Sequence, residues 1–168
     1  MANWSEREIE TAVEATFMKL GYPTANPEQL EAVKEFVKGK DVFVSTPTGS
    51  GKSLCYGSLP FVFDLLSSGG SQRSIVIVVS PLKALMLDQV QVFTAKGVSC
   101  AYVGAQDDCG DLLDRVVKGE FSLVFMSPES LVSGCRWREM FRSATYQDNL
   151  VGVVVDEAHC IDKWLVAS

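Results

Sequence analysis

The chain has 168 residues, of which 47% are hydrophobic and 21% charged, as expected of one globular domain with a substantial core. Its formal net charge of −6, without a cluster of Lys and Arg, argues against tight nucleic-acid binding through charge alone. The polar, acidic start and the absence of an apolar run of about 18 residues argue against a secretory signal and a membrane span.

Short apolar runs alternate with longer stretches of helical character along the chain. Strands are predicted at 41–45, 74–80, 98–103, 121–127 and 150–155. Helices are predicted near 5–20, 27–38, 52–66, 82–95, 107–118 and 136–145. The strand runs are apolar at nearly every position, which is typical of strands buried on both faces. The alternation predicts an α/β fold, a parallel sheet with helices on both faces, and a ligand site at the carboxyl ends of the strands.

A glycine-rich segment, TPTGSGKS (46–53), stands between the first predicted strand and a predicted helix. Its glycines let successive backbone N–H groups turn toward a phosphate, and the helix N-terminus adds its dipole. Lys52 then reaches the β and γ phosphates, and the Ser53 hydroxyl is placed to ligate Mg²⁺. The strict phosphate-loop pattern has glycine where this chain has Thr46, and the alternative is a tight turn that merely links strand to helix. The predicted nucleotide-binding residues of the loop are Thr48, Gly49, Ser50, Gly51, Lys52 and Ser53.

Two carboxylates end the last predicted strand, in LVGVVVDEAH (150–159). Hydrolysis of a γ-phosphate needs both a metal and a positioned water. We therefore expect Asp156 to hold Mg²⁺ and Glu157 to orient and deprotonate the attacking water, so that Lys52, Asp156 and Glu157 form the catalytic set. The alternative is a solvated acidic strand end, which is common in proteins.

The combined motifs resemble those of one family. TPTGSGKS with DEAH (156–159) is similar to superfamily 2 helicases, and SPLKALMLDQV (80–90), MSPESL (126–131) and DEAHCIDKW (156–164) narrow the resemblance to the first RecA-like lobe of RecQ-family DNA helicases. The resemblance covers the chain from about Leu20 to Trp164. It implies a RecA-like fold, ATP and Mg²⁺ as cofactors, single-stranded or partly duplex DNA as partner, 3′-to-5′ unwinding and a location in the nucleus.

The resemblance also implies roles outside the phosphate loop. Tyr22 would stack on adenine, and Gln29 would hydrogen-bond the edge of the adenine ring. The family usually has an aromatic residue and a basic residue where this chain has Ala25 and Asn26. Ser80 and Lys83 would contact DNA phosphates, and Trp164 would begin an aromatic-rich loop that senses single-stranded DNA. The alternatives are that Tyr22 is a packing residue and that Lys83 is a solvated charge.

The chain ends soon after the acidic pair, so we expect a partial helicase ATP-binding domain over 1–168, with a helical segment at 1–19 and no second lobe. In the family that the motifs resemble, the second lobe supplies an arginine finger for ATP hydrolysis. Without that lobe, the chain is expected to bind ATP, to bind DNA weakly and not to unwind DNA. The alternatives are a non-catalytic ATP-binding module and an unrelated phosphate-loop enzyme. The five cysteines lack a C-x-x-C pair, which favours reduced thiols in an intracellular protein over a zinc site.

Overall fold

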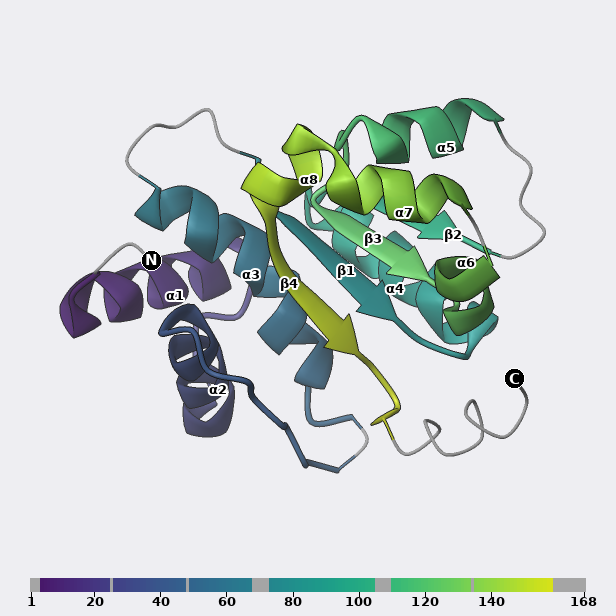
Figure 1. Cartoon of the computed structure of the whole chain (residues 1–168). Coiled ribbons are helices and arrows are strands. Elements are labelled where there is room, and N and C mark those ends of the chain that lie inside the picture. Colours follow the sequence, from purple (N-terminus) through teal and green to yellow (C-terminus); the bar gives the residue numbers. More distant parts are fainter. Residues whose placement is uncertain are drawn as a thin grey trace. The chain divides into compact units, whose positions relative to one another are not determined.

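A computed structural model describes residues 4–24, 26–47, 49–67, 73–104, 110–133 and 135–158 (Figure 1). The chain divides into two compact units, Met1–Ser74 and Ile75–Ser168. The first unit is helical and holds the glycine-rich segment. The second unit holds a parallel sheet, and the acidic pair follows the last strand of that sheet.

Three helices form the first unit: α1 (Glu6–Lys19), α2 (Pro27–Val37) and α3 (Lys52–Leu66). Helix α1 starts with a capping box, in which the Ser5 hydroxyl accepts from the Glu8 N–H and the Glu8 carboxylate accepts from the Ser5 N–H. Asn26 caps α2 by accepting from the Glu28 N–H at 3.0 Å. The three helices contact one another in every pairing, and each contributes buried apolar side chains to their shared interior. This packing holds the N-terminus of α3, where the glycine-rich segment ends.

Four parallel strands form the sheet of the second unit: β1 (Ile75–Val79), β2 (Cys100–Val103), β3 (Leu123–Met126) and β4 (Leu150–Val155). Their order is β2-β3-β1-β4. Helices α4 (Lys83–Ala95), α5 (Gly110–Val117), α6 (Pro128–Ser133), α7 (Cys135–Arg142) and α8 (Ala144–Asn149) lie between the strands in sequence. Figure 1 shows α5 and α7 on one face of the sheet and α4 on the other. The predicted parallel α/β architecture is confirmed for this unit.

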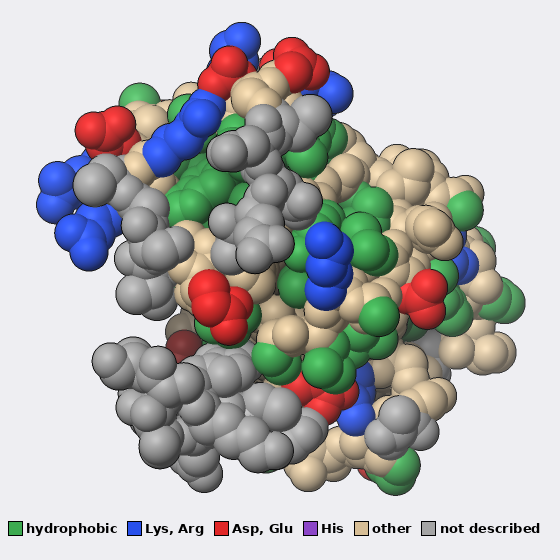
Figure 2. All heavy atoms as spheres, turned by 90° about the vertical axis from the view of Figure 1, so that its right-hand side faces the viewer, with side chains coloured by type: hydrophobic (Ala, Val, Ile, Leu, Met, Phe, Trp, Pro, Cys, Tyr) green, Lys and Arg blue, Asp and Glu red, His purple; other side chains and the backbone are tan. Residues whose placement is uncertain are grey.

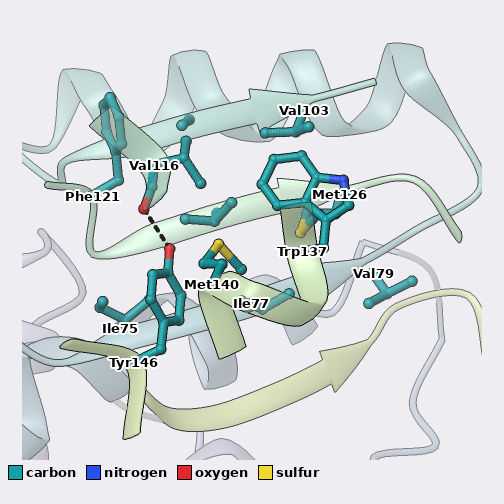
Figure 3. Packing of buried hydrophobic residues seen from close by; sticks show 12 residues of the cluster. Ile75, Ile77, Val79, Val103, Val116, Phe121, Met126, Trp137, Met140 and Tyr146 are labelled. Atoms are coloured by element: carbon teal, nitrogen blue, oxygen red, sulfur yellow. Dashed lines mark hydrogen bonds between the residues drawn. The ribbon is translucent and has the colours of Figure 1, made fainter. Parts of the chain in front are cut away.

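An apolar cluster fills the space between the sheet and the helices on the side of α7 (Figure 3). Alternate residues of β1 and β3 project into it, as the two-residue period of a strand requires. Trp137 and Met140 of α7 pack there with Tyr146 of α8. The Tyr146 hydroxyl donates to the Val116 carbonyl oxygen at 2.7 Å, so this buried polar group is satisfied. Burial raises the pKa of the Tyr146 phenol above its ordinary value, which keeps it protonated and donating at neutral pH.

The segment predicted as the first strand, 41–45, is not a strand in the structure. Phe43 is 82% exposed and Val42 is exposed as well. A strand is stabilised by a ladder of backbone hydrogen bonds, and no described residue forms a ladder with this segment. The apolar, β-branched composition of this segment favours a strand, but the segment has no neighbouring strand among the described residues to pair with.

The last strand, β4, lies at an edge of the sheet, although an apolar run like this one is typical of strands buried on both faces. Its hydrogen-bonded neighbour among the described residues is β1 alone, which leaves it at an edge of the sheet. Val153 is 52% exposed and Val155 is 42% exposed. An apolar run in sequence is thus compatible with an edge position, because composition alone does not report which neighbours a strand has.

The predicted helix at 136–145 is two helices, and a further short helix precedes them. Ser143 lies between α7 and α8 with an extended backbone, and its hydroxyl accepts from the Tyr146 N–H at 3.4 Å. This cap starts α8 at a position where the sequence pattern predicted that the preceding helix would continue. Pro128 begins α6, and the Ser127 hydroxyl accepts from the Ser130 N–H at 3.2 Å. Among the described residues, no helix has the length and apolar character needed to cross a membrane.

Four helices end on a glycine with left-handed backbone. After α4, Gly97 has φ 80°, and the Val98 N–H donates to the Phe93 carbonyl at 3.0 Å. After α5, Gly119 has φ 74°, and the Glu120 N–H donates to the Arg115 carbonyl at 3.1 Å. Gly21 and Gly39 end α1 and α2 with the same pattern. This closing motif satisfies carbonyls at the helix end and requires a residue that tolerates positive φ.

Gly119→Ala is expected to destabilise the protein more than the matched variant Gly97→Ala. Both variants place a side chain at positive φ, which costs about 1–2 kcal/mol. At Gly119 a Cβ would also meet Thr145 Cγ2 at 2.6 Å and Ile75 Cδ1 at 3.2 Å, whereas at Gly97 it would meet nothing within 4 Å. This overpacking adds about 1–3 kcal/mol. Urea unfolding measures the difference, and equal losses in the two variants would contradict the packing argument.

Candidate functional site

The glycine-rich segment leads into the N-terminus of α3. Gly49 has φ 83° and Gly51 has φ 79°, so both adopt the left-handed backbone that glycine favours. Gly51 is the N-cap of α3 and supplies no side-chain hydrogen bond to the first turn. The first-turn N–H groups and the helix dipole therefore point toward the segment, as a phosphate-binding loop requires. Ser53 lies in this first turn and is half-buried.

Side chains from two helices contact this loop. The Lys52 Nζ donates to the Thr46 carbonyl at 2.6 Å and to the Pro47 carbonyl at 3.3 Å. The Gln29 Nε2, on the first turn of α2, donates to the carbonyls of Ser50 at 2.9 Å and Gly51 at 3.1 Å. The structure thus brings Gln29 to the phosphate loop itself, a contact that the sequence did not predict.

Gly51 has a second constraint besides its backbone angle. A Cβ at this position would lie 2.6 Å from the Gln29 Nε2. The close approach of the amide to the loop backbone therefore needs a residue without a side chain. The signal for this contact in sequence is weak, because Gln29 and Gly51 are far apart in the chain and neither residue type specifies the other.

Tyr22 lies just past the end of α1, where its N–H donates to the Phe17 carbonyl at 2.8 Å. This closing bond fixes the backbone at the tyrosine, and 38% of the residue is exposed. An exposed ring on an anchored backbone fits a stacking role, and that role stays a prediction. Thr48, the other predicted nucleotide-binding residue of this region, lies outside the described residues.

The acidic pair follows β4 directly. The Asp156 N–H donates to the Val79 carbonyl at 2.9 Å, which extends the β1–β4 pairing by one residue. One oxygen of the Asp156 carboxylate, Oδ1, accepts from the Glu157 N–H at 3.0 Å. Both residues are half-buried. The strand pairing therefore holds Asp156 at the carboxyl end of the sheet, where the sequence predicted it.

Glu157 has φ 55° and is the one non-glycine residue with positive φ in the described part of the chain. A left-handed backbone costs a residue with a Cβ about 1–2 kcal/mol. Such strain persists where the surroundings impose it, and it concentrates at functional sites. No sequence pattern predicted this angle, because glutamate carries no preference for this conformation.

The two residues predicted to contact DNA have different surroundings. Ser80 follows β1, is 1% exposed, and its hydroxyl has no hydrogen-bond partner in the described residues. Lys83 is exposed at the start of α4, with its Nζ 5.5 Å from the centroid of the Tyr102 ring. Lys83 therefore presents its charge to solvent beside a helix N-terminus, whereas Ser80 does not present its hydroxyl. Trp164 lies outside the described residues.

Basic side chains do not gather into one patch on the face drawn in Figure 2. Lys and Arg alternate with Asp and Glu along its upper left edge, and a single basic side chain stands among hydrophobic ones near the centre. In the second unit, Arg115 pairs with Glu120 and Arg136 with Asp114, which offsets the charge of these two basic side chains. The described basic side chains on this face therefore do not form the cluster of Lys and Arg that is typical of a nucleic-acid-binding patch.

The thiols of Cys55 and Cys100 have low reactivity. Burial raises the pKa of the Cys55 thiol to about 11 and that of the Cys100 thiol to about 12. Both are neutral thiols at physiological pH and are poor nucleophiles and metal ligands in that form. No group of three or more His, Cys, Asp or Glu side chains suited to hold a metal occurs in the described part of the chain.

The motifs and the fold agree with a comparison against protein families. A model described as DEAD/DEAH box helicase matches residues 26–167. This chain belongs to the DEAD/DEAH box helicase family. That family is one of ATP-dependent helicases, so membership implies ATP binding.

Individual relatives of this helicase domain are RecQ-family DNA helicases, which confirms the resemblance drawn from the motifs. It is 39% identical to the ATP-dependent helicase SGS1 of Saccharomyces cerevisiae over 146 residues, which cover 84% of this chain and 10% of that protein. It is 28% identical to the ATP-dependent DNA helicase RecQ of Haemophilus influenzae over 160 residues, which cover 94% of this chain and 24% of that protein. The chain therefore spans a small part of the length of these relatives.

The fold itself recurs in a solved helicase structure. A crystal structure of the DUF1998 helicase MrfA bound to DNA and AMPPNP matches with a TM-score of 0.68 and 21% identity, covering 90% of this chain and 21% of that one. This likeness confirms the RecA-like helicase fold. Within it, the structure brings Gln29 to the phosphate loop and Asp156 next to the end of β1. The meeting of Lys52 with Asp156 in one site stays a prediction.

The strain at Glu157 leads to a test that separates backbone from side chain. Glu157→Gly is expected to be more stable than Glu157→Ala by about 1 kcal/mol, because glycine adopts φ 55° without steric cost. Both variants lack the carboxylate, so its loss cancels from the comparison. Urea unfolding of the two proteins measures the difference. An alanine variant as stable as the glycine variant would show that this backbone is not strained in solution.

Proposed function

We propose that this chain is the ATP-binding lobe of a RecQ-type helicase that couples ATP hydrolysis to 3′-to-5′ unwinding of DNA. The observation that carries the proposal is a phosphate loop with Lys52 and Ser53 at the N-terminus of a buried helix, in a member of a helicase family with RecQ relatives. Unwinding needs two lobes that close around ATP. For the 168 residues themselves the proposed activity is ATP binding, and unwinding is proposed for a helicase that contains this lobe.

Each predicted site residue has a role in this proposal. When ATP binds, the Lys52 ammonium leaves the carbonyls of Thr46 and Pro47 and donates to the β and γ phosphates. The N–H groups in the first turn of α3 donate to the same phosphates. Tyr22 stacks on adenine and Gln29 bonds its edge. Glu157 orients the attacking water and accepts its proton.

The donor set also suits the metal that this family implies. Ser53 offers a hydroxyl oxygen and Asp156 a carboxylate. Mg²⁺ takes oxygen ligands and is commonly held by one or two protein groups together with phosphates and water, so no larger carboxylate cluster is needed. Ser53 and Asp156 would hold the ion, which neutralises developing charge on the phosphates.

DNA is proposed as the partner, with Lys83 and the N-terminus of α4 as a phosphate contact. The support is the exposed ammonium of Lys83 and the DNA helicase names of the relatives. The burial of Ser80 weakens its own predicted role in direct contact. The nuclear location stays a prediction, because the relatives include proteins of both yeast and bacteria.

Lys52→Ala is expected to weaken Mg²⁺-dependent ATP binding about ten- to a hundredfold, the range for a lost hydrogen bond to a charged group. Titration calorimetry measures the dissociation constant. The matched control is Lys40→Ala, which removes an exposed lysine of the same unit and is expected to leave affinity unchanged. Equal ATP affinity in wild type and Lys52→Ala would refute the proposed site.

Lys83→Ala is expected to lower the salt dependence of single-stranded DNA binding by about one unit of slope, as loss of one phosphate contact does. Lys118→Ala removes the same charge from an exposed position after α5 and serves as the control. Fluorescence anisotropy at several salt concentrations measures both. Binding is expected to be weak throughout, and nanomolar affinity at physiological salt would contradict a chain of net charge −6.

A further inference from the structure

Three polar residues stand side by side just past the ends of three neighbouring strands of the second unit. They are Ser127 after β3, Ser80 after β1 and Asp156 after β4. Backbone pairing continues to this row, because the Ser80 N–H donates to the Met126 carbonyl at 3.1 Å and the Asp156 N–H to the Val79 carbonyl at 2.9 Å. The registers of β1 with β3 and with β4 make the three residues direct neighbours, with about 5 Å between adjacent strands.

The side chains of this row point to one face of the sheet. Val79 projects into the apolar cluster beside α7, so the two-residue period of a strand turns Ser80 to the opposite face, where α4 lies. Residues in register on parallel strands share a face, so Asp156 and Ser127 point the same way as Ser80. The Ser80 hydroxyl and the Asp156 carboxylate are therefore adjacent groups on one face of the sheet.

The Ser80 hydroxyl is buried, with 1% of the residue exposed, and it has no hydrogen-bond partner among the described residues. A buried polar group without a partner lowers stability, and an ordered water with at least two polar neighbours removes that cost. On one side of Ser80, the Ser127 hydroxyl is already bonded to the Ser130 hydroxyl at 3.0 Å and accepts from the Ser130 N–H at 3.2 Å. On the other side, Asp156 carries a carboxylate, which has about four acceptor sites and is the stronger acceptor.

We propose that Ser80 is a positioning residue for Asp156: its hydroxyl donates to one ordered water, and that water donates to the Asp156 carboxylate. The two groups are not bonded directly, and one water spans the separation of side chains on adjacent strands. The bridge holds the carboxylate from the side of β1, while the Glu157 N–H donates to its Oδ1 from the following turn. This inference rests on the proposed function, in which Asp156 holds Mg²⁺. Ser80 then acts on the metal site through Asp156 and not by touching the ion.

Urea unfolding of the full chain, without nucleotide or Mg²⁺, distinguishes this bridge from a hydroxyl that stays unsatisfied. Ser80→Ala is expected to raise the unfolding equilibrium constant about two- to tenfold, the range for one lost hydrogen bond. An unsatisfied hydroxyl predicts the opposite sign, because alanine removes a buried polar group that has no partner. In the Asp156→Ala background, Ser80→Ala is expected no longer to raise the constant.

The matched control is Ser122→Ala, which removes a buried serine before β3, at the opposite end of the sheet. Its effect on unfolding is expected to be equal in the wild-type and Asp156→Ala backgrounds, because distant sites are additive. Ser80→Thr keeps the hydroxyl and is expected to keep the coupling with Asp156. A Ser80→Ala variant more stable than wild type would overturn the bridge, as would an equal effect of Ser80→Ala in both backgrounds.

A second measurement tests the consequence for the metal. By titration calorimetry, Ser80→Ala is expected to weaken ATP·Mg²⁺ binding about tenfold, as loss of an outer partner of a metal ligand does, and to leave ATP binding in EDTA unchanged. Ser122→Ala is expected to change neither affinity. If unfolding shows the coupling but neither wild type nor any variant binds ATP, the proposed function fails and the bridge stands. If wild type binds ATP·Mg²⁺ and Ser80→Ala binds it equally well, the positioning role is overturned.

Discussion

The parallel pairing of β1 with its two neighbours is the constraint on which the second unit depends. β1 is bonded to β3 on one side and to β4 on the other, and its residues Ile75–Val79 are all buried. Parallel strands in register end at the same edge, so this pairing brings Ser80 and Asp156 to one edge of the sheet. The hydrogen bond from the Asp156 N–H to the Val79 carbonyl extends the pairing of β1 and β4 to the first residue of the acidic motif. A slip of one residue would turn the strand's side chains to the other face and displace the carboxylates.

The first unit meets a different requirement, which is the supply of backbone donors to a phosphate. Glycines at positive φ curl the chain, and a helix without a side-chain cap leaves its first N–H groups available. Within the protein, the Ser50 N–H donates to the Pro47 carbonyl and the Leu54 N–H to the Gly51 carbonyl, while the side chains of Gln29 and Lys52 donate to carbonyls of the loop. Affinity for nucleotide is then a difference between two sets of hydrogen bonds. Contacts that stabilise the empty loop therefore oppose binding.

Glu157, which is proposed to orient the attacking water, departs from the backbone conformation that glutamate prefers. Glutamate at φ 55° opposes folding locally, and the pairing of β4 with β1 together with the turn after it imposes the angle. Glycine would relieve the strain but would remove the carboxylate that the proposed chemistry needs. The rest of the sheet, with its fully buried β1 and β3, supplies the stability that tolerates this cost.

The sequence by itself determined the fold class, four of the five predicted strands, the phosphate-loop and acidic motifs and the family, because these depend on local patterns of glycine, charge and apolar periodicity. It predicted a strand at 41–45, and this was wrong, since strand pairing depends on neighbours distant in the chain. It also did not predict the Gln29 contact with the loop, the bond between the Thr46 and Ser50 hydroxyls or the backbone angle at Glu157. Tertiary structure alone decided these, because hydrogen bonds between side chains and loop backbone form only after packing has fixed the distances between them.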